Sequence, residues 1–386
     1  MVMTDLPFRH TDTRLLTVLL FALGCIAWGH PVPVSAQGDA LETPARPTEM
    51  AEHSLILDIT RTGDRLFAVG ERGHIIWTDN LNSLSWEQSA VPVRTTLTSC
   101  FFADASIGWA VGHDGVVLKT EDGGFTWHTQ LNGFEANKLM AQHATALRAQ
   151  AEQALSDAAP EETSARQEAF EAAEYGAQDA ISFLEEGASR PFLDVWFRNE
   201  QEGFVIGAFG LILRTIDGGE SWTPWFDRLD NPYSLHLNSI RKIGQALYIT
   251  AEAGALFRST DNGQTWQRLD SPYDGSLFGI LGSGDGRLIT FGLRGHVFQS
   301  LDGGDSWTEI ETGTSSSLFG GTLLPDGRAV LVGTQGVTVF IDRNGRVSEI
   351  RQDNHRLPLS QVISLNTELL TVGLGGIQAQ PLTHDQ

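Results

Sequence analysis

Cysteine is almost absent from this sequence of 386 residues, which contains only Cys25 and Cys100. Cys25 lies in an apolar N-terminal segment with the features of a cleaved leader. After cleavage only Cys100 would remain, which excludes an intramolecular disulfide. Because Cys100 lies in the apolar stretch Ser99–Phe102, we expect it to be an inert core residue.

Positive charge is also scarce. The chain has 26 Lys and Arg against 48 Asp and Glu, which gives a net charge of −22. Only Lys119, Lys138 and Lys242 are lysines. Nucleic acids and anionic lipids are polyanions, so this balance argues against both as bulk partners.

The N-terminus is predicted to be a secretory signal over residues 1–36. Arg9 and Arg14 precede an apolar core at Leu15–Trp28, and Val34–Ala36 offers a small-residue cleavage site before Gln37. We therefore expect export to the periplasm, or to the thylakoid lumen if the organism is a phototroph.

Two alternatives remain for the N-terminal segment. Ala22–Cys25 resembles the motif for lipid attachment but lacks Leu three positions before Cys25. An uncleaved anchor is the other alternative, although the apolar core is shorter than the roughly 20 residues needed to span a bilayer.

Glycine, by contrast, is abundant, with 41 residues, and many of them lie in two repeated phrases. The first phrase is Ser/Thr-x-Asp-x-Gly-x-Ser/Thr-Trp, and it resembles the Asp-box, or BNR repeat, of β-propellers. We expect its Asp to bond the backbone of its own turn and its Trp to anchor the next strand by burial, a structural role. The four copies carry Asp122 and Trp127, Asp217 and Trp222, Asp261 and Trp266, and Asp302 and Trp307.

The second phrase, apolar-Gly-x-x-Gly, predicts the number of blades. Its first glycine falls at positions 70, 112, 207, 292, 333 and 373, and Ala251 holds this place in a looser seventh unit. Successive units are 40 to 44 residues apart, except for one interval of 95. A period near 40 is typical of four-stranded propeller blades. The sequence therefore predicts an all-β, seven-bladed β-propeller over residues 53–386.

The two ends of the propeller are expected to meet. Residues 37–52 have no periodicity and are interpreted as a linker. The seventh blade is one strand short at its C-terminal end. We expect the segment just before His53 to supply that strand, which would remove an exposed sheet edge.

The long interval contains an insertion of another kind, residues 132–190, between blades two and three. It is rich in Ala, Glu and Gln, with apolar residues at helical spacing in two runs that Pro160 separates. We predict an antiparallel α-helical hairpin, whose deletion should spare the propeller. It is either a solvated decoration or, as we favour, a docking element for a partner.

Blade topology places the Gly-x-x-Gly turns and the loops between blades on one face, called the rim here, opposite the Asp-boxes. The rim is rich in Arg and aromatic residues, which are typical of interface anchors. The alternative is that they are ordinary loop residues paired with acids such as Asp227, Asp230 and Asp353. The candidate partner-binding residues are Arg72, Arg94, His113, Phe209, Trp225, Tyr233, Arg294 and Arg356.

The full repeat, for example Ile107–Trp127, resembles that of the photosystem II stability and assembly factor family, over Leu55–Leu382 without the insertion. The resemblance implies a non-catalytic lumenal propeller that binds a newly made membrane subunit, partly through an arginine-bearing face. Arg72 and Arg294 match the arginine-containing repeat. The insertion departs from the family pattern, so the partner is expected to be a photosystem-like complex or another membrane assembly, such as a transporter.

Two further functions are weighed against this one. A sialidase-like glycosidase, which also uses Asp-boxes, needs a Tyr nucleophile with a Glu partner, but the chain has only four Tyr, and Tyr248 is expected in a second strand. A glycan- or peptide-binding propeller is the third hypothesis. We expect no enzyme activity, no cofactor and no metal, because the spacing of His74, His113 and His296 matches no ligand signature.

Overall fold

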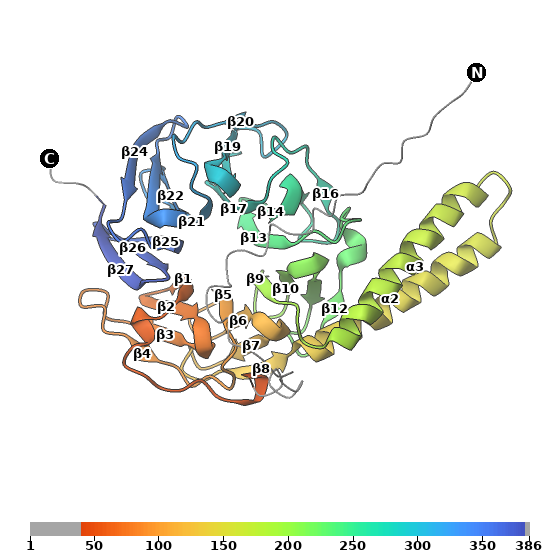
Figure 1. The fold of residues 1–386 in the computed structure, drawn as a ribbon, viewed down its shortest axis with the longest axis horizontal. Coiled ribbons are helices and arrows are strands. Elements are labelled where there is room, and N and C mark those ends of the chain that lie inside the picture. The colour runs from red at the N-terminus through yellow and green to blue at the C-terminus, as the bar shows by residue number, and fades with distance from the viewer. Residues whose placement is uncertain (1–39, 383–386) are drawn as a thin grey trace, which may run out of the picture. The chain divides into compact units, whose positions relative to one another are not determined.

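The computed structural model describes residues 40–382, so the expected signal over residues 1–36 lies outside the described part of the chain. The described residues belong to one compact unit. Seven antiparallel sheets follow one another along the chain and surround a central axis (Figure 1). Six sheets have four strands and the last has three. The predicted seven-bladed propeller is therefore confirmed.

The first three blades comprise β1 (Ile56–Thr62), β2 (Arg65–Gly70), β3 (Ile75–Thr78) and β4 (Glu87–Gln88); β5 (Leu97–Phe102), β6 (Gly108–Gly112), β7 (Val117–Thr120) and β8 (His128–Leu131); and β9 (Phe192–Phe197), β10 (Gly203–Gly207), β11 (Ile212–Thr215) and β12 (Thr223–Pro224).

The other four blades comprise β13 (Leu237–Ile243), β14 (Ala246–Ala251), β15 (Leu256–Ser259) and β16 (Gln267–Arg268); β17 (Leu277–Gly282), β18 (Leu288–Gly292), β19 (Val297–Ser300) and β20 (Thr308–Glu309); β21 (Leu318–Leu323), β22 (Ala329–Gly333), β23 (Val337–Ile341) and β24 (Val347–Gln352); and β25 (Leu359–Leu365), β26 (Glu368–Gly373) and β27 (Gly376–Pro381).

In blades one to six the Gly-x-x-Gly turn is a short 3₁₀ turn between the second and third strands, and in blade seven Gly373 and Gly376 pair across a two-residue turn. In blade two, a Cβ on Gly112 would lie 2.2 Å from the Thr96 carbonyl oxygen, so only glycine allows this approach. The second glycine, Gly115, has φ +62. Asp114, between them, is also left-handed, with φ +56. The phrase repeats because every blade but the fourth, which has Ala251 here, makes the same close approach to the preceding loop.

The Asp-box turns are held by their carboxylates. Asp217 Oδ1 accepts hydrogen bonds from the Ser221 N–H at 3.0 Å and the Thr215 hydroxyl at 2.8 Å. Trp127 and Trp222 are buried, while Trp266 and Trp307 are only partly buried. The Ser221 hydroxyl is the main cause that lowers the pKa of Asp217 below its ordinary value.

Closure of the ring differs from the expectation. The seventh sheet, β25-β26-β27, has three strands, and the segment before His53 forms a 3₁₀ turn, η1 (Ala51–His53), that contacts β27. Upstream of it, the Ala45 N–H donates to the Val91 carbonyl at 3.0 Å, so this stretch lies on the loop after blade one. The prediction of a fourth strand was wrong, because the residues just before His53 turn in a 3₁₀ conformation instead of extending along β27.

The first and last blades instead meet directly. The Ser360 hydroxyl of β25 donates to the Ile56 carbonyl of β1 at 2.8 Å. Residues of β1, β2, β3, β25 and β26 share one hydrophobic cluster, in which Ile56, Leu66 and Leu370 are fully buried. Burial of apolar side chains therefore closes the ring without an exchanged strand.

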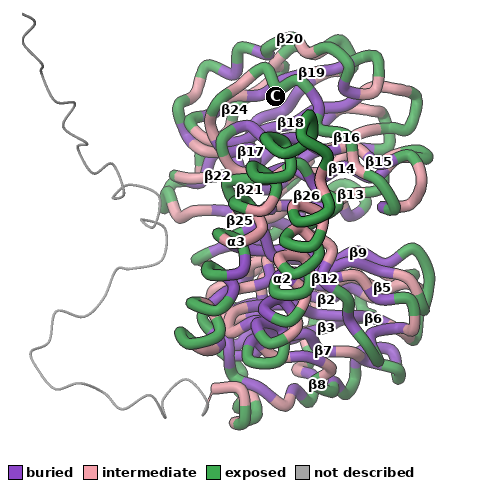
Figure 2. Tube along the Cα trace, turned by 90° about the vertical axis from the view of Figure 1, so that its right-hand side faces the viewer, coloured by how far each residue is buried: buried purple, intermediate pink, exposed green. Residues whose placement is uncertain are grey.

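The insertion is a helical hairpin of α2 (Gly133–Ser156) and α3 (Thr163–Glu186), as predicted. Asn132 begins α2 in a capping box with Glu135, which satisfies free backbone N–H groups. Ala141 and Ala144 pack on Ala177 and Ala180 of α3. The hairpin extends outward from the ring, and most of its outer turns are exposed (Figures 1 and 2).

Candidate functional site

The hairpin joins the rim, as the topology predicted. The ring centroid of Phe183 in α3 lies 5.3 Å from that of Phe209, which is in the Gly-x-x-Gly turn of blade three. The Asp-boxes lie at the opposite ends of the strands, where the Gly303 N–H bonds the Gly286 carbonyl in the turn between β17 and β18. One face therefore carries the turns and the hairpin, and the other carries the Asp-boxes.

A buried polar clamp fixes the base of the hairpin. The Asn137 amide donates to the carbonyls of Phe183 at 2.9 Å and Gly187 at 2.6 Å. Its oxygen accepts from Arg190, whose guanidinium lies 4.1 Å from the Phe183 ring centroid. Burial lowers the pKa of Arg190 to about 10, although Glu186 opposes the shift. The clamp ties α2, α3 and the start of blade three together.

The same base belongs to the propeller core. Ala136 and Met140 of α2 are buried in one cluster with Trp109 of blade two and Phe192 of blade three. The structure therefore argues against the expectation that removal of the whole insertion spares the propeller, because it would open this cluster.

Aromatic side chains gather where the hairpin meets blades three and four. Phe209 has φ +53 and a 45% exposed side chain, and it lies 4.6 Å from the His236 ring. Tyr233, in the next loop, is 81% exposed. His143 of α2 contacts the Asp227 carboxylate at 3.1 Å. This sector presents exposed aromatic surface beside a fixed helical element.

The arginines of the rim are spread around the ring. Arg72 and Arg294 occupy equivalent exposed positions in the turns of blades one and five, each with φ +58. A left-handed non-glycine residue costs about 1–3 kcal/mol, and such residues cluster at functional sites. Because blades six and seven separate the two arginines, they do not form one patch.

The other predicted rim residues differ in their surroundings. Arg94 and Arg356 are exposed in loops, and His113 is half-buried, with a pKa that burial lowers although Asp114 opposes the shift. Trp225 was predicted to be a rim anchor, but its indole N–H donates to the Gly263 carbonyl of the neighbouring Asp-box at 2.8 Å. That contact places the indole between blades three and four.

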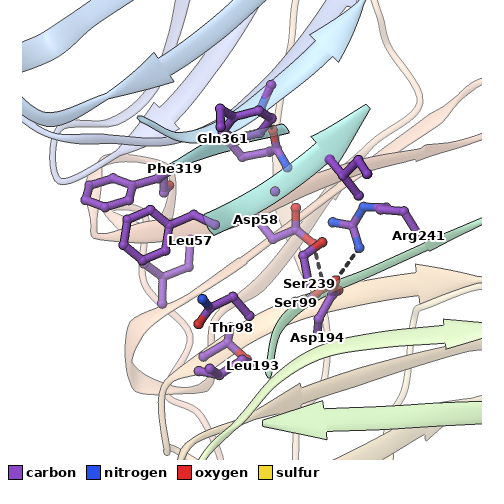
Figure 3. Close-up of a pocket in the computed structure, with 18 of the residues that line it drawn as sticks. Leu57, Asp58, Thr98, Ser99, Leu193, Asp194, Ser239, Arg241, Phe319 and Gln361 are labelled. Atoms are coloured by element: carbon purple, nitrogen blue, oxygen red, sulfur yellow. Dashed lines mark hydrogen bonds and ion pairs between the residues drawn. The ribbon is translucent and has the colours of Figure 1, made fainter. Parts of the chain in front are cut away.

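A central cavity of about 120 Å³ was not predicted from the sequence (Figure 3). A β-bulge in the first strand of every blade turns two residues toward it. Phe278 and Phe319 contact each other at 5.2 Å on one side. Asp58, Asp194 and Arg241 line another side, as Figure 3 shows.

The two cavity carboxylates connect adjacent blades. Asp58 Oδ2 accepts from the Cys100 N–H of blade two at 3.0 Å. Asp194 Oδ2 accepts from the Ile240 N–H of blade four at 2.8 Å and forms an ion pair with Arg241. These bonds engage the carboxylates in structural contacts rather than in acid–base chemistry. Their signal in the sequence was an Asp at the same position of two apolar strands.

Neither a metal site nor a glycosidase site with a Tyr nucleophile receives support within residues 40–382. No cluster of three His, Cys, Asp or Glu side chains there is arranged to hold a metal ion. Tyr248 lies in β14, is buried, and donates its hydroxyl to the Gly303 carbonyl at 3.0 Å.

Among the described helices, none is long and apolar enough to cross a membrane.

Known proteins share both sequence and fold with this chain. A curated protein of Synechococcus sp. (strain CC9902), "Photosystem II assembly lipoprotein Ycf48", is 36% identical over 102 residues, which cover 25% of this chain. The match spans only 31% of the length of that relative.

Solved structures extend the similarity of fold. YCF48 from Cyanidioschyzon merolae has a TM-score of 0.56 at 12% identity, over 85% of this chain and 95% of that one. A structure described as "YCF48 bound to D1 peptide" has a TM-score of 0.49 at 21% identity, over 74% of this chain and 80% of that one.

The family model for the photosynthesis system II assembly factor YCF48 matches residues 78–148 and 179–355, more than half of the chain. That match covers Asp-boxes, Gly-x-x-Gly turns and both ends of the helical insertion. The chain therefore belongs to the YCF48 family of photosystem II assembly factors.

Proposed function

We propose that the protein is a non-catalytic, exported assembly factor that binds a membrane-protein complex, or one of its subunits, through the rim. Family membership supports the assembly role. The single observation that carries the choice of surface is the sector where exposed Phe209 and Tyr233 lie beside the clamped hairpin. Exposed aromatic residues on a fixed scaffold are typical of interface anchors.

Charge indicates what the partner presents. The hairpin over residues 133–186 has eleven acidic and three basic residues. Arg72 and Arg294 stand on the other blades of the same face. A complementary partner would place basic groups against the hairpin and acidic groups against the arginines. A photosystem-like subunit and a transporter subunit both remain candidates.

The location that we propose follows from the same argument. A partner in a membrane is accessible to an exported protein from the periplasm, or from the thylakoid lumen in a phototroph. Fractionation of cells that express the full chain tests this location. Recovery with the cytoplasmic fraction would contradict it.

Capture of solubilised membrane proteins on the immobilised chain tests the surface. The variant Arg72→Glu with Arg294→Glu should keep its melting temperature, because both residues lie in exposed turns. It should capture the partner more weakly, because it loses contacts between arginine and carboxylate groups. Salt screens such contacts, so the salt dependence of capture should also weaken. A second variant, lacking residues 149–172, removes only the distal hairpin.

Charge reversal on the opposite face provides the matched control. Arg61, near the end of β1, and Arg198, in the turn after β9, lie on the Asp-box face in ion pairs with Asp64 and Glu202. The variant Arg61→Glu with Arg198→Glu makes the same change in net charge and should capture the partner as the wild type does. Equal capture by the wild type and by the rim and hairpin variants would reject the rim as the interface.

A further inference from the structure

Aromatic rings fill the boundaries between the first four blades near the Asp-box face. An aromatic residue of the second strand stacks on, or meets the edge of, a ring from the next blade, and the Asp-box Trp of that blade lies beside them. The pairs are Phe67 with Phe102 at 4.2 Å, Trp109 with Phe197 at 3.4 Å, and Phe204 with Trp266 at 6.2 Å.

The boundary between blades five and six has aliphatic residues at the three equivalent positions, namely in the second strand, in the first strand of the next blade and at the Asp-box Trp. Strand register places Ile289 where Phe67, Trp109 and Phe204 stand in other blades. Leu323 takes the position of Phe102 and Phe197. Val347 faces Ile341 where Trp would stand in a complete Asp-box. The degenerate Asp-box of blade six therefore removes aromatic volume from this boundary.

A pocket of about 400 Å³ lies at this boundary. Its apolar wall includes Ile289 and Leu323, and the guanidinium-bearing residues Arg287 and Arg343 also line it. Exposed residues of the pocket, such as Pro325, place its mouth on the Asp-box face. The volume falls in the range of about 300–1,000 Å³ that is usual for ligand pockets.

Arg287 shows what this pocket would hold. Strand register makes it the equivalent of Arg65 in blade one. The Arg65 guanidinium lies 4.8 Å from the Trp77 ring and 4.6 Å from the Phe125 ring. Within residues 40–382, no ring makes such a contact with Arg287, although the buried Nε of both arginines lacks a hydrogen-bond partner.

Two backbone carbonyls hold the Arg287 guanidinium in place. Its terminal nitrogens donate to Gly327 and Asp342, each at 2.9 Å. The group is thus fixed beside the apolar wall before any ligand arrives. Cation–π contacts of this kind contribute about 0.5–2 kcal/mol, more where water is excluded.

We propose that the pocket between blades five and six binds an aromatic side chain of a partner polypeptide, with the ring against Ile289 and Leu323 and its face toward Arg287. The four boundaries from blade one to blade five, each with an Asp-box Trp in its hydrophobic cluster, give the chain its own precedents for aromatic packing. Because the pocket opens on the face opposite the rim, this contact is independent of the proposed interface.

Saturation-transfer NMR with N-acetyl-tryptophanamide tests the proposal on the whole exported chain. The probe should show transfer at millimolar concentration, as is reasonable for a single ring, whereas N-acetyl-leucinamide should show much less. A Trp-containing peptide should bind at least as well as the isolated probe, and stronger binding of free indole would instead indicate a small-molecule site. Absence of transfer to the aromatic probe would overturn the proposal.

Filling the pocket provides the decisive comparison. Val347→Trp restores the residue of a complete Asp-box and should reduce binding of the probe at least tenfold. Ile216→Trp adds an exposed Trp to the Asp-box of blade three and should leave binding unchanged. If Val347→Trp does not fold, Ile289→Phe introduces the ring found at Phe67 and serves the same purpose. Equal binding by the wild type and the filled variant would refute the proposal.

Discussion

Asp58 and Asp194 are joined through one hydroxyl group, that of Ser99, whose Oγ lies 3.0 Å from Asp58 Oδ2 and 2.9 Å from Asp194 Oδ1. A serine hydroxyl has a single proton to donate. Only one of the two carboxylates can therefore accept this hydrogen bond. The other carboxylate is more stable next to the Ser99 oxygen when it is protonated. Asp194 has the ion pair with Arg241, so Asp58 is the better candidate.

Replacement of the two acids should have unequal effects. Asp194→Asn leaves the Arg241 guanidinium without its carboxylate and should lower the free energy of unfolding by about 3 kcal/mol, the lower end for a buried pair because Arg241 reaches the cavity. Asp58→Asn should change it by less than about 1 kcal/mol. Urea unfolding followed by Trp fluorescence measures both. Equal losses would contradict the assignment of the proton to Asp58.

The same pair predicts a pH dependence. Burial raises the pKa of Asp58, although Arg241 opposes the shift. The unfolded chain therefore ionises at a lower pH than the folded one, so Asp58 reduces stability as pH rises from about 3.8 through the raised pKa. The stability of Asp58→Asn relative to the wild type should increase across this window and then level off. A difference that is constant with pH would show that the pKa is not raised.

The pKa values of the Asp-box carboxylates are shifted in the opposite direction, so their effect on stability with pH is reversed. Hydrogen bonds from Ser306 and Ser300 hold the pKa of Asp302 far below its ordinary value, and Asp217 is lowered in the same way. Their contribution is present above the ordinary pKa and is lost as pH falls toward the lowered pKa. Asp217→Asn should therefore flatten the loss of stability on acidification below about pH 4, as measured by urea midpoints. An unchanged slope would contradict the shift.

The four Asp-boxes should not be equally important for stability. Asp217→Ala should cost about 1–2 kcal/mol through its turn bonds, with partner capture intact. Replacement of Trp222, which is 6% exposed, by Ala should lower the free energy of unfolding by about 3–5 kcal/mol. Trp307→Ala should cost less, because Trp307 is only partly buried. Loss of partner capture by folded Asp217→Ala would instead place the binding site on the Asp-box face.

The repeats predicted the propeller because each repeated glycine and Asp is required by one local turn. A local requirement of this kind is visible in the sequence as a short motif. Gly112, for example, is required by contact with Thr96, and the same requirement recurs in every blade but the fourth. The closure was mispredicted, since counting strands suggested an exchanged strand where Ala51–His53 form a 3₁₀ turn.

The site was less accessible to sequence reasoning. Which residues face the central cavity depends on a bulge beside Asp58 and its equivalents, and no residue type marks that bulge. The angular separation of Arg72 and Arg294 follows from the order of blades around the ring. The contact of Trp225 with Gly263 crosses a blade boundary, so a position in the sequence could not distinguish it from an exposed anchor.

Shortening the hairpin and removing it should have different consequences. A variant lacking residues 149–172, closed by a short glycine-containing turn, keeps the Ala141, Ala144, Ala177 and Ala180 contacts and the Asn137 clamp. Its melting temperature should match the wild type. Removal of residues 132–190 also takes away buried Met140 and should lower the free energy of unfolding by about 2–5 kcal/mol.

Comparison of the two deletions separates stability from recognition. If the outer turns of the hairpin contact the partner, the short deletion should lose membrane-partner capture without any loss of stability. The longer deletion would then lose both, because the core between blades two and three is opened as well. Full capture by a stable short deletion would mean that the outer turns are a solvated decoration, and that recognition depends on the sector around Phe209 and Tyr233.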